Sequence, residues 1–164
     1  MAFDAFIKLD GIPGDSSDDK HKEWINVLSF STGMSQPATM VAKSSAGAAG
    51  GRVEFSEFSF IHYMDKASPK LFLNCANGTH IPNVVVHLCR ATGDKQKYLE
   101  YKLTDVIIAS VRPGGSSGGG EDVPLEEVSL TFATIEVIYT ETDAAGKAKG
   151  DIKAKYDLKA QKGT

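Results

Sequence analysis

The feature that most constrains this chain is a repeated interruption of β-strand alternation. In three stretches apolar and polar residues alternate, slip by one position and then resume in the opposite phase. These stretches are residues 52–61, 98–111 and 128–139, with slips near Ser56–Glu57, near Thr104–Asp105 and between Phe132 and Ile135. A one-residue slip turns the faces of a strand over unless a bulge absorbs it, and bulges bend strands. Three bent strands predict a mainly β fold, in which two coiled antiparallel sheets close into a small β-barrel.

Further strands are predicted where the alternation is regular. Phe3, Ala5, Ile7 and Leu9 share one face at the start of the chain, with Phe6 as an apolar exception on the polar face. The other predicted strands cover residues 24–32, 83–91 and 152–158. A period of two is typical of strands with one buried face.

One short helix is predicted on the flank of the barrel. Ser68 offers a hydroxyl as N-cap, and Pro69 suits the first helical position because its missing N–H would be unpaired there. Gly78 can adopt the left-handed conformation that ends many helices. The residues predicted to pack on the barrel are Leu71, Phe72 and Cys75.

Two segments interrupt the strand pattern of what is predicted to be a single domain over residues 1–164. Residues 37–51 contain mostly Ala, Ser, Thr and Gly, which leaves them little to bury. A long segment of this kind in a compact domain usually has a function of its own, so an extended arm is predicted. Residues 112–124 form a glycine-rich connection between two strands and are predicted to be flexible.

Charge and hydropathy exclude several classes of protein. The net charge is -3, and only three of the 18 cationic residues are Arg, which argues against binding to nucleic acid. No run of 18 apolar residues occurs, so no membrane insertion is expected. The first ten residues alternate like a strand and lack the basic and apolar segments of a secretory signal peptide.

Motifs that could carry chemistry fail in their context. Gly114–Gly118 matches G-x-S-x-G around Ser116, but a further strand follows instead of the helix that a serine hydrolase requires. Glu121 stands where a phosphate-binding loop needs lysine. Cys75, Cys89 and His87 lack the close paired spacings of a zinc site, so free thiols and no metal are expected. We therefore predict no enzymatic activity and no cofactor.

Several runs, taken in order, resemble one family. They are Phe6–Leu9, Gly11–Ser16 followed by His21, Ser31–Gln36, Tyr63–Pro69 and Val128–Tyr139. Each is weak alone, but their order and spacing across the chain are similar to those of the Hcp (hemolysin-coregulated) proteins of bacterial type VI secretion.

The resemblance implies a structural protein that forms hexameric rings around a wide channel. Such rings stack into the inner tube of a contractile injection device, inside a sheath and behind a spike protein of the VgrG type. The tube is secreted when the device fires, so the protein is expected in the bacterial cytoplasm before firing and in the medium or a target cell afterwards. Rings of the family also hold small effector proteins. The alternative is a ring that serves chiefly as an effector chaperone, with tube formation secondary.

The resemblance also suggests roles for individual residues. Ser31 matches a position near the channel wall and is predicted to contact cargo. The arm is predicted to reach a neighbouring subunit or the next ring. Its candidate assembly residues are Ala38, Thr39, Met40, Val41, Ala42, Lys43, Gly47, Gly50 and Gly51.

Overall fold

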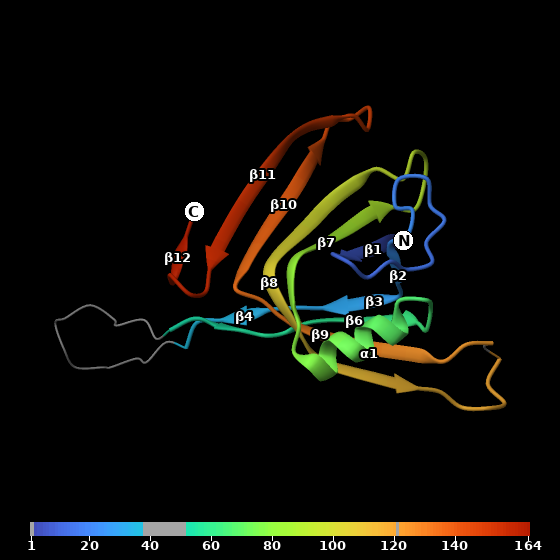
Figure 1. Cartoon of the computed structure of the whole chain (residues 1–164). Coiled ribbons are helices and arrows are strands. Elements are labelled where there is room, and N and C mark those ends of the chain that lie inside the picture. Colours follow the sequence, from blue (N-terminus) through green and yellow to red (C-terminus); the bar gives the residue numbers. More distant parts are fainter. Residues whose placement is uncertain (1, 38–51, 121) are drawn as a thin grey trace.

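The computed structural model describes residues 2–37, 52–120 and 122–164, and the predicted assembly arm therefore lies outside the described residues. The described chain is mainly β with one short helix, as predicted (Figure 1). Its elements are β1 (Phe3–Leu9), β2 (Ile25–Val27), β3 (Ser29–Ser31), β4 (Met34–Ser35), β5 (Glu54–Phe55), β6 (Phe58–Tyr63), α1 (Ser68–Asn77), β7 (His80–Arg90), β8 (Lys97–Gly114), β9 (Leu125–Thr131), β10 (Thr134–Thr142), β11 (Ala148–Asp157) and β12 (Lys162–Gly163).

Ten of these strands form one antiparallel sheet that branches at β8. The main path runs β12-β11-β10-β8-β7-β1-β2, and the branch runs from β8 through β9 and β6 to β3. Figure 1 shows β8 curving through the molecule from the neighbourhood of β10 to that of β9. Strands β4 and β5 form a separate two-stranded sheet.

The closed barrel predicted from the sequence is wrong for the described strands, because the strand order has free ends at β12, β2 and β3. The predicted strand over 24–32 is divided at Leu28 into β2 and β3, which pair with β1 and β6 respectively. The two branches thus meet through the continuous chain around Leu28 rather than through a hydrogen-bonded ladder.

The three predicted slips have different structural origins. In β8 the strand continues, and Asp105 takes a positive φ of 50° at the point where pairing changes from β10 to β9. In the other two stretches the slip is a break. Residues 56–57 separate β5 from β6, and residues 132–133 separate β9 from β10. Bent or broken strands allow one sheet to curve around its own core.

The core fills the space between the two branches. Ile7, Val86 and Leu103 come from the main path, and Phe58 and Leu130 come from the other branch; all are essentially inaccessible to solvent. Burial of large apolar side chains from both branches is the dominant favourable contribution to this fold.

Helix α1 closes one end of this core. Leu71 is fully buried and Cys75 partly buried, but Phe72 is 68% exposed, so the prediction that Phe72 packs inward is wrong. Ser68 is the first helical residue rather than the N-cap, which is Ala67. Gly78 ends the helix in the left-handed conformation with φ 63°, as predicted.

Candidate functional site

The base of the predicted arm is held by the two-stranded sheet of β4 and β5. Met34 lies opposite Phe55, and Ser35 lies opposite Glu54. The Ser56 N–H also donates to the Gly33 carbonyl at 2.9 Å. The described segments before residue 38 and after residue 51 are therefore held side by side by this strand pair.

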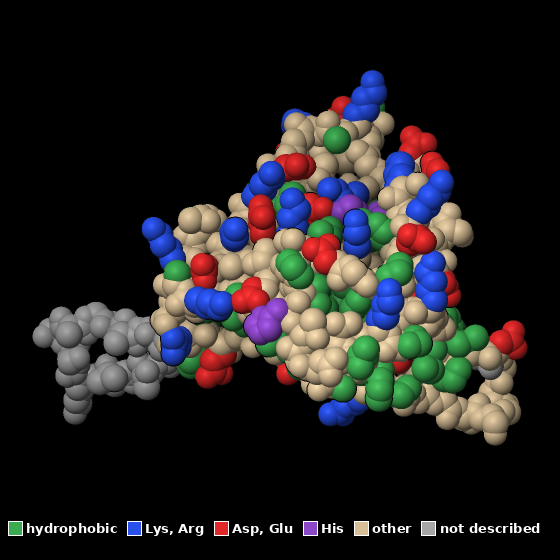
Figure 2. Space-filling model, in the orientation of Figure 1, with side chains coloured by type: hydrophobic (Ala, Val, Ile, Leu, Met, Phe, Trp, Pro, Cys, Tyr) green, Lys and Arg blue, Asp and Glu red, His purple; other side chains and the backbone are tan. Residues whose placement is uncertain are grey.

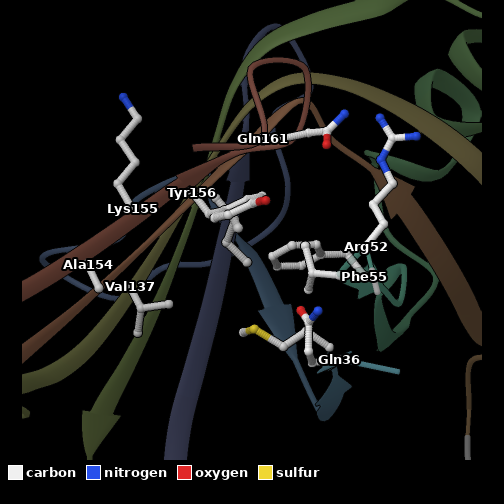
Figure 3. Close-up of a pocket in the computed structure, with 11 residues that line it drawn as sticks. Gln36, Arg52, Phe55, Val137, Ala154, Lys155, Tyr156 and Gln161 are labelled. Atoms are coloured by element: carbon white, nitrogen blue, oxygen red, sulfur yellow. The ribbon is translucent and has the colours of Figure 1, made fainter. Parts of the chain in front are cut away.

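Aromatic contacts attach this base to the main sheet. The ring of Phe55 lies 5.3 Å from that of Tyr156 on β11 and 6.1 Å, edge to face, from that of Phe132. A hollow of about 960 Å³ opens beside these rings, between β4–β5 and β10–β11 (Figure 3). Its lining residues are Met34, Gln36, Arg52, Val53, Phe55, Ile135, Val137, Ala154, Lys155, Tyr156 and Gln161.

The rim of this hollow is polar. Figure 3 shows Arg52 and Gln161 together on one side of the hollow and Lys155 pointing away from them. With its amide oxygen turned toward the guanidinium group, Gln161 accepts a hydrogen bond from Arg52 Nε at 3.2 Å. The arrangement combines an apolar floor with hydrogen-bonding groups at the edge, which is the composition of a protein–protein contact surface.

Ser31, the predicted channel residue, lies at the end of β3 and is exposed. Strand pairing places it in a transverse row of four serines across β3, β6, β9 and β8. The row is Ser31, Ser59, Ser129 and Ser110, each opposite the next in the ladder. The Ser59 and Ser129 hydroxyls share a hydrogen bond of 2.9 Å, so their side chains lie on one face of the sheet. The alternating neighbours Phe58, Phe60 and Leu130 point to the opposite face and are buried.

A sequence analysis could not find this row. The four serines are separated by 28, 51 and 19 positions if taken in chain order, and no local motif joins them. Only the register of three strand pairs brings them together. The row gives this face of the sheet a small, uncharged and hydrogen-bonding surface.

The opposite side of the same strands carries an apolar patch with α1. Figure 2 shows hydrophobic side chains gathered over α1 and the neighbouring strand ends. Phe72 and Leu73 are 68% and 55% exposed there. A hollow of about 580 Å³ beside Phe72 is lined by Met64, Asp65, Ser68, Pro69, Phe72, Val111, Pro113 and Glu126.

A buried hydrogen-bonded pair lies below this patch. His62 Nε2–H donates to Glu126 Oε1 at 2.9 Å, and both side chains are almost completely shielded from solvent. The other ring nitrogen of His62 has no hydrogen-bond partner and lies 4.0 Å from Asp65 Oδ2. The pair ties β6 to β9 beneath the exposed hydrophobic residues.

The residues weighed for chemistry are dispersed. Ser116 lies in the connection between β8 and β9, and Glu121 lies outside the described residues. Cys75 and Cys89 are free thiols, and burial raises the pKa of Cys89. Among residues 2–37, 52–120 and 122–164, no group of three or more His, Cys, Asp or Glu side chains is arranged to hold a metal ion. The same part of the chain has no helix that is both long and apolar enough to cross a membrane.

Comparison with known proteins identifies the family. The family model described as "Type VI secretion system effector, Hcp" matches residues 6–139. The chain is 39% identical to the Hcp1 protein of Pseudomonas aeruginosa over 161 residues, which cover 97% of each chain.

Solved structures agree with this result. A structure described as that of a type six secretion system protein has 35% sequence identity and a TM-score of 0.92, covering 99% of this chain and 100% of the other. Hcp1 from Salmonella typhimurium has 42% identity and a TM-score of 0.81, with complete coverage of both chains. This chain therefore belongs to the Hcp family of type VI secretion proteins.

Proposed function

We propose that this protein is a structural subunit of the type VI secretion tube, which assembles head to tail into hexameric rings. The observation that carries the proposal is the near-complete correspondence with Hcp1 proteins in both sequence and fold. In the proposed device the rings stack, lie inside a contractile sheath and follow a VgrG-type spike. The protein waits in the bacterial cytoplasm and is secreted when the device fires.

The surface of the subunit supports such an assembly. A closed ring needs two different surfaces on each subunit that fit one another. The hollow at the arm base and the apolar patch over α1 lie on separate parts of the molecule, and we assign them to the two sides of this interface. An interface of standard size buries about 800 Å² on each partner, so patches of this kind would contribute substantially to it.

The arm, residues 37–51, is the proposed main assembly element. Its base is anchored through Phe55, whereas its own residues carry little apolar surface for the domain. Deletion of residues 38–50 joins Pro37 to Gly51 and leaves a loop of five residues between β4 and β5, a length that hairpins commonly use. We expect the deleted protein to fold but to form fewer rings.

This deletion can be tested by size exclusion with light scattering and by circular dichroism. Native-like circular dichroism together with a lower native mass supports the role of the arm. A protein that keeps its full native mass contradicts the role, and so does one that has lost its fold.

The second candidate function is a carrier ring that protects effectors. The observation that favours it is the exposed Ser31 on a face with three further serines. We propose that this face lines the channel and contacts cargo, where small neutral hydroxyls can hydrogen-bond to a protein surface without charge selection.

The cargo proposal predicts that Ser31→Gln lowers the recovery of a small effector protein co-expressed with the ring. Ser117→Gln, an exposed serine in the β8–β9 connection, is the matched control and is expected to recover the effector fully. Equal recovery with both variants, at unchanged native mass, contradicts cargo contact at Ser31 while leaving the tube proposal intact.

A further inference from the structure

Four side chains outside the surfaces described above form a continuous hydrogen-bonded chain. Asp18 Oδ2 lies 2.7 Å from His21 Nδ1, and His21 Nε2 lies 2.9 Å from His87 Nδ1. The remaining nitrogen of His87, Nε2, lies 2.6 Å from Glu100 Oε2. A carboxylate thus stands at each end of two imidazoles that contact one another directly.

The chain attaches a loop to the main sheet. Asp18 and His21 belong to residues 10–24, which connect β1 to β2, while His87 is on β7 and Glu100 on β8. His21 is only 3% exposed, because its ring stacks on Phe6 at a centroid distance of 4.2 Å. Phe6, the apolar residue on the otherwise polar face of the first strand, therefore packs against the His21 ring.

The Trp24 ring packs against both imidazole rings. Its ring centroid lies 4.8 Å from that of His21 and 4.6 Å from that of His87. The loop is also folded on itself, with hydrogen bonds from Gly14 N to the Glu23 carbonyl at 2.7 Å and from Ser16 N to the Trp24 carbonyl at 2.9 Å. These hydrogen bonds lie within the loop and do not depend on its contact with β7.

The number of hydrogens on the two imidazole rings decides whether all three contacts of this chain can form at once. The three contacts need one hydrogen each, and all three must come from the four imidazole nitrogens when both carboxyl groups are ionised. Two neutral imidazoles carry only two hydrogens, so the complete chain contains one imidazolium, with its proton shared between His21 and His87. A fourth hydrogen would place two N–H groups against one another across 2.9 Å. Such a contact has no acceptor and sets two cations side by side.

The surroundings oppose the fourth proton. Burial is the main cause that lowers the pKa of His87; Lys97 and His21 lower it further, and Glu100 acts in the opposite direction. The hydrogen bond from His21 lowers the pKa of Asp18, which keeps that carboxyl group ionised. The other titratable or charged groups around the chain are Asp4, Lys20, Cys89, Lys95 and Lys102.

We propose that this chain is an acid-released latch, which holds residues 10–24 on the sheet with one shared proton and releases them when the histidine pair takes up a second cation. The sign follows from the protons bound in each state. With the loop open, each histidine binds a proton below its ordinary pKa of about 6.5. Below about pH 6.5 the closed state binds one proton fewer than the open state, so closure is lost as the pH falls. Above that pH the closed state binds one proton more, so closure also weakens as the pH rises and is strongest near about 6.5. The opening constant of the loop then rises about tenfold for each pH unit below 6.5, until the closed chain itself accepts the proton.

Hydrogen–deuterium exchange from pH 6.5 to pH 5 tests this proposal on the full-length protein. After correction for the intrinsic pH dependence of exchange, protection of peptides covering residues 10–24 is expected to fall about tenfold per pH unit below 6.5. Peptides from β10 and β11 serve as the internal reference and are expected to keep their protection. Protection of residues 10–24 that does not change with pH overturns the latch, as does an equal loss in β10 and β11.

A matched pair of variants isolates the titrating group. In His87→Gln the amide oxygen can accept from His21 and the amide nitrogen can donate to Glu100, so both contacts persist without a second titratable ring. This variant is expected to keep the loop protected with no acid dependence. His80→Gln, which changes an exposed histidine bonded to Asp105, is expected to behave like the wild type. Retention of the wild-type acid dependence in His87→Gln refutes the latch.

If His87→Gln does not fold, nitrogen-15 NMR of histidine-labelled wild-type protein gives a test without any substitution. At pH 7 the shared proton predicts scalar coupling between His21 Nε2 and His87 Nδ1, and the coupling is expected to vanish on acidification together with loop protection. The absence of coupling at every pH between 5 and 8 would overturn the shared proton.

Discussion

The aromatic anchor of the arm base makes Phe55→Ala an informative perturbation. Phe55 is partly buried, and its ring contacts Tyr156 and Phe132 at centroid distances of 5.3 Å and 6.1 Å. An aromatic side chain buries about 150–250 Å² when enclosed, so a partly buried ring removes ~150 Å² from water. At ~25 cal/mol per Å² this area corresponds to nearly 4 kcal/mol, which a compact unfolded state reduces to about 3 kcal/mol.

Urea denaturation at fixed protein concentration measures this loss. With a slope of about 2 kcal/mol per M, the midpoint of Phe55→Ala is expected roughly 1.5 M below that of the wild type. Ile152→Ala is the control: this side chain is 63% exposed and lies outside both proposed contact surfaces, so the variant is expected within about 0.5 kcal/mol of the wild type. The concentration must be held constant because assembly adds to apparent stability. If the two variants have the same midpoint, Phe55 does not anchor the arm base and the reasoning is refuted.

Three further predictions test other contacts. Glu126→Ala leaves the buried His62 N–H without its acceptor and is expected to lower the free energy of unfolding by about 2 kcal/mol, whereas the neighbouring exposed Glu127→Ala lowers it by less than about 0.5 kcal/mol in the same assay. Gly14→Ala places a Cβ 2.6 Å from a backbone carbonyl and is expected to lower thermal stability, unlike Gly120→Ala, where nothing lies within 4 Å. Hydrogen bonds from Lys159 and His80 lower the pKa of Asp105, so the contribution of this carboxylate to stability is present above pH 3.8 and lost as the pH falls. Asn tolerates the positive φ at this position. In Asp105→Asn the urea midpoint is therefore expected to depend less on pH below about pH 4 than it does in the wild type.

Alternation in the sequence predicted which stretches form strands, because burial of one face leaves a local signal. It could not predict where strands change partners. The slip at Asp105 is a bend within β8, whereas the slip after Phe132 is a break between β9 and β10. Both produce the same pattern of residues, because a bend and a break each reverse the buried face. The division at Leu28, which leaves the ladder open, has no local signal at all.

The candidate sites also differ in whether a local sequence signal predicts them. The channel role of Ser31 was predicted through a family resemblance that local motifs carry, whereas the arm over residues 37–51 was predicted from its composition. The serine row and the chain from Asp18 to Glu100 were not predicted, since each joins residues far apart in the sequence, the first through strand register and the second through packing of the β1–β2 loop on the sheet. In the sequence alone His87 was considered only beside Cys89 as a weak metal ligand.

The native mass of the full-length protein in solution is the most direct test of the proposed tube subunit. Size exclusion coupled to light scattering, at several protein concentrations and neutral pH, measures it without any variant. The hexameric ring predicts a mass near six times the 17.5 kDa of one chain, or a whole multiple of that value where rings stack. A monomer at every concentration would contradict the ring, and with it the channel on which both proposed functions depend.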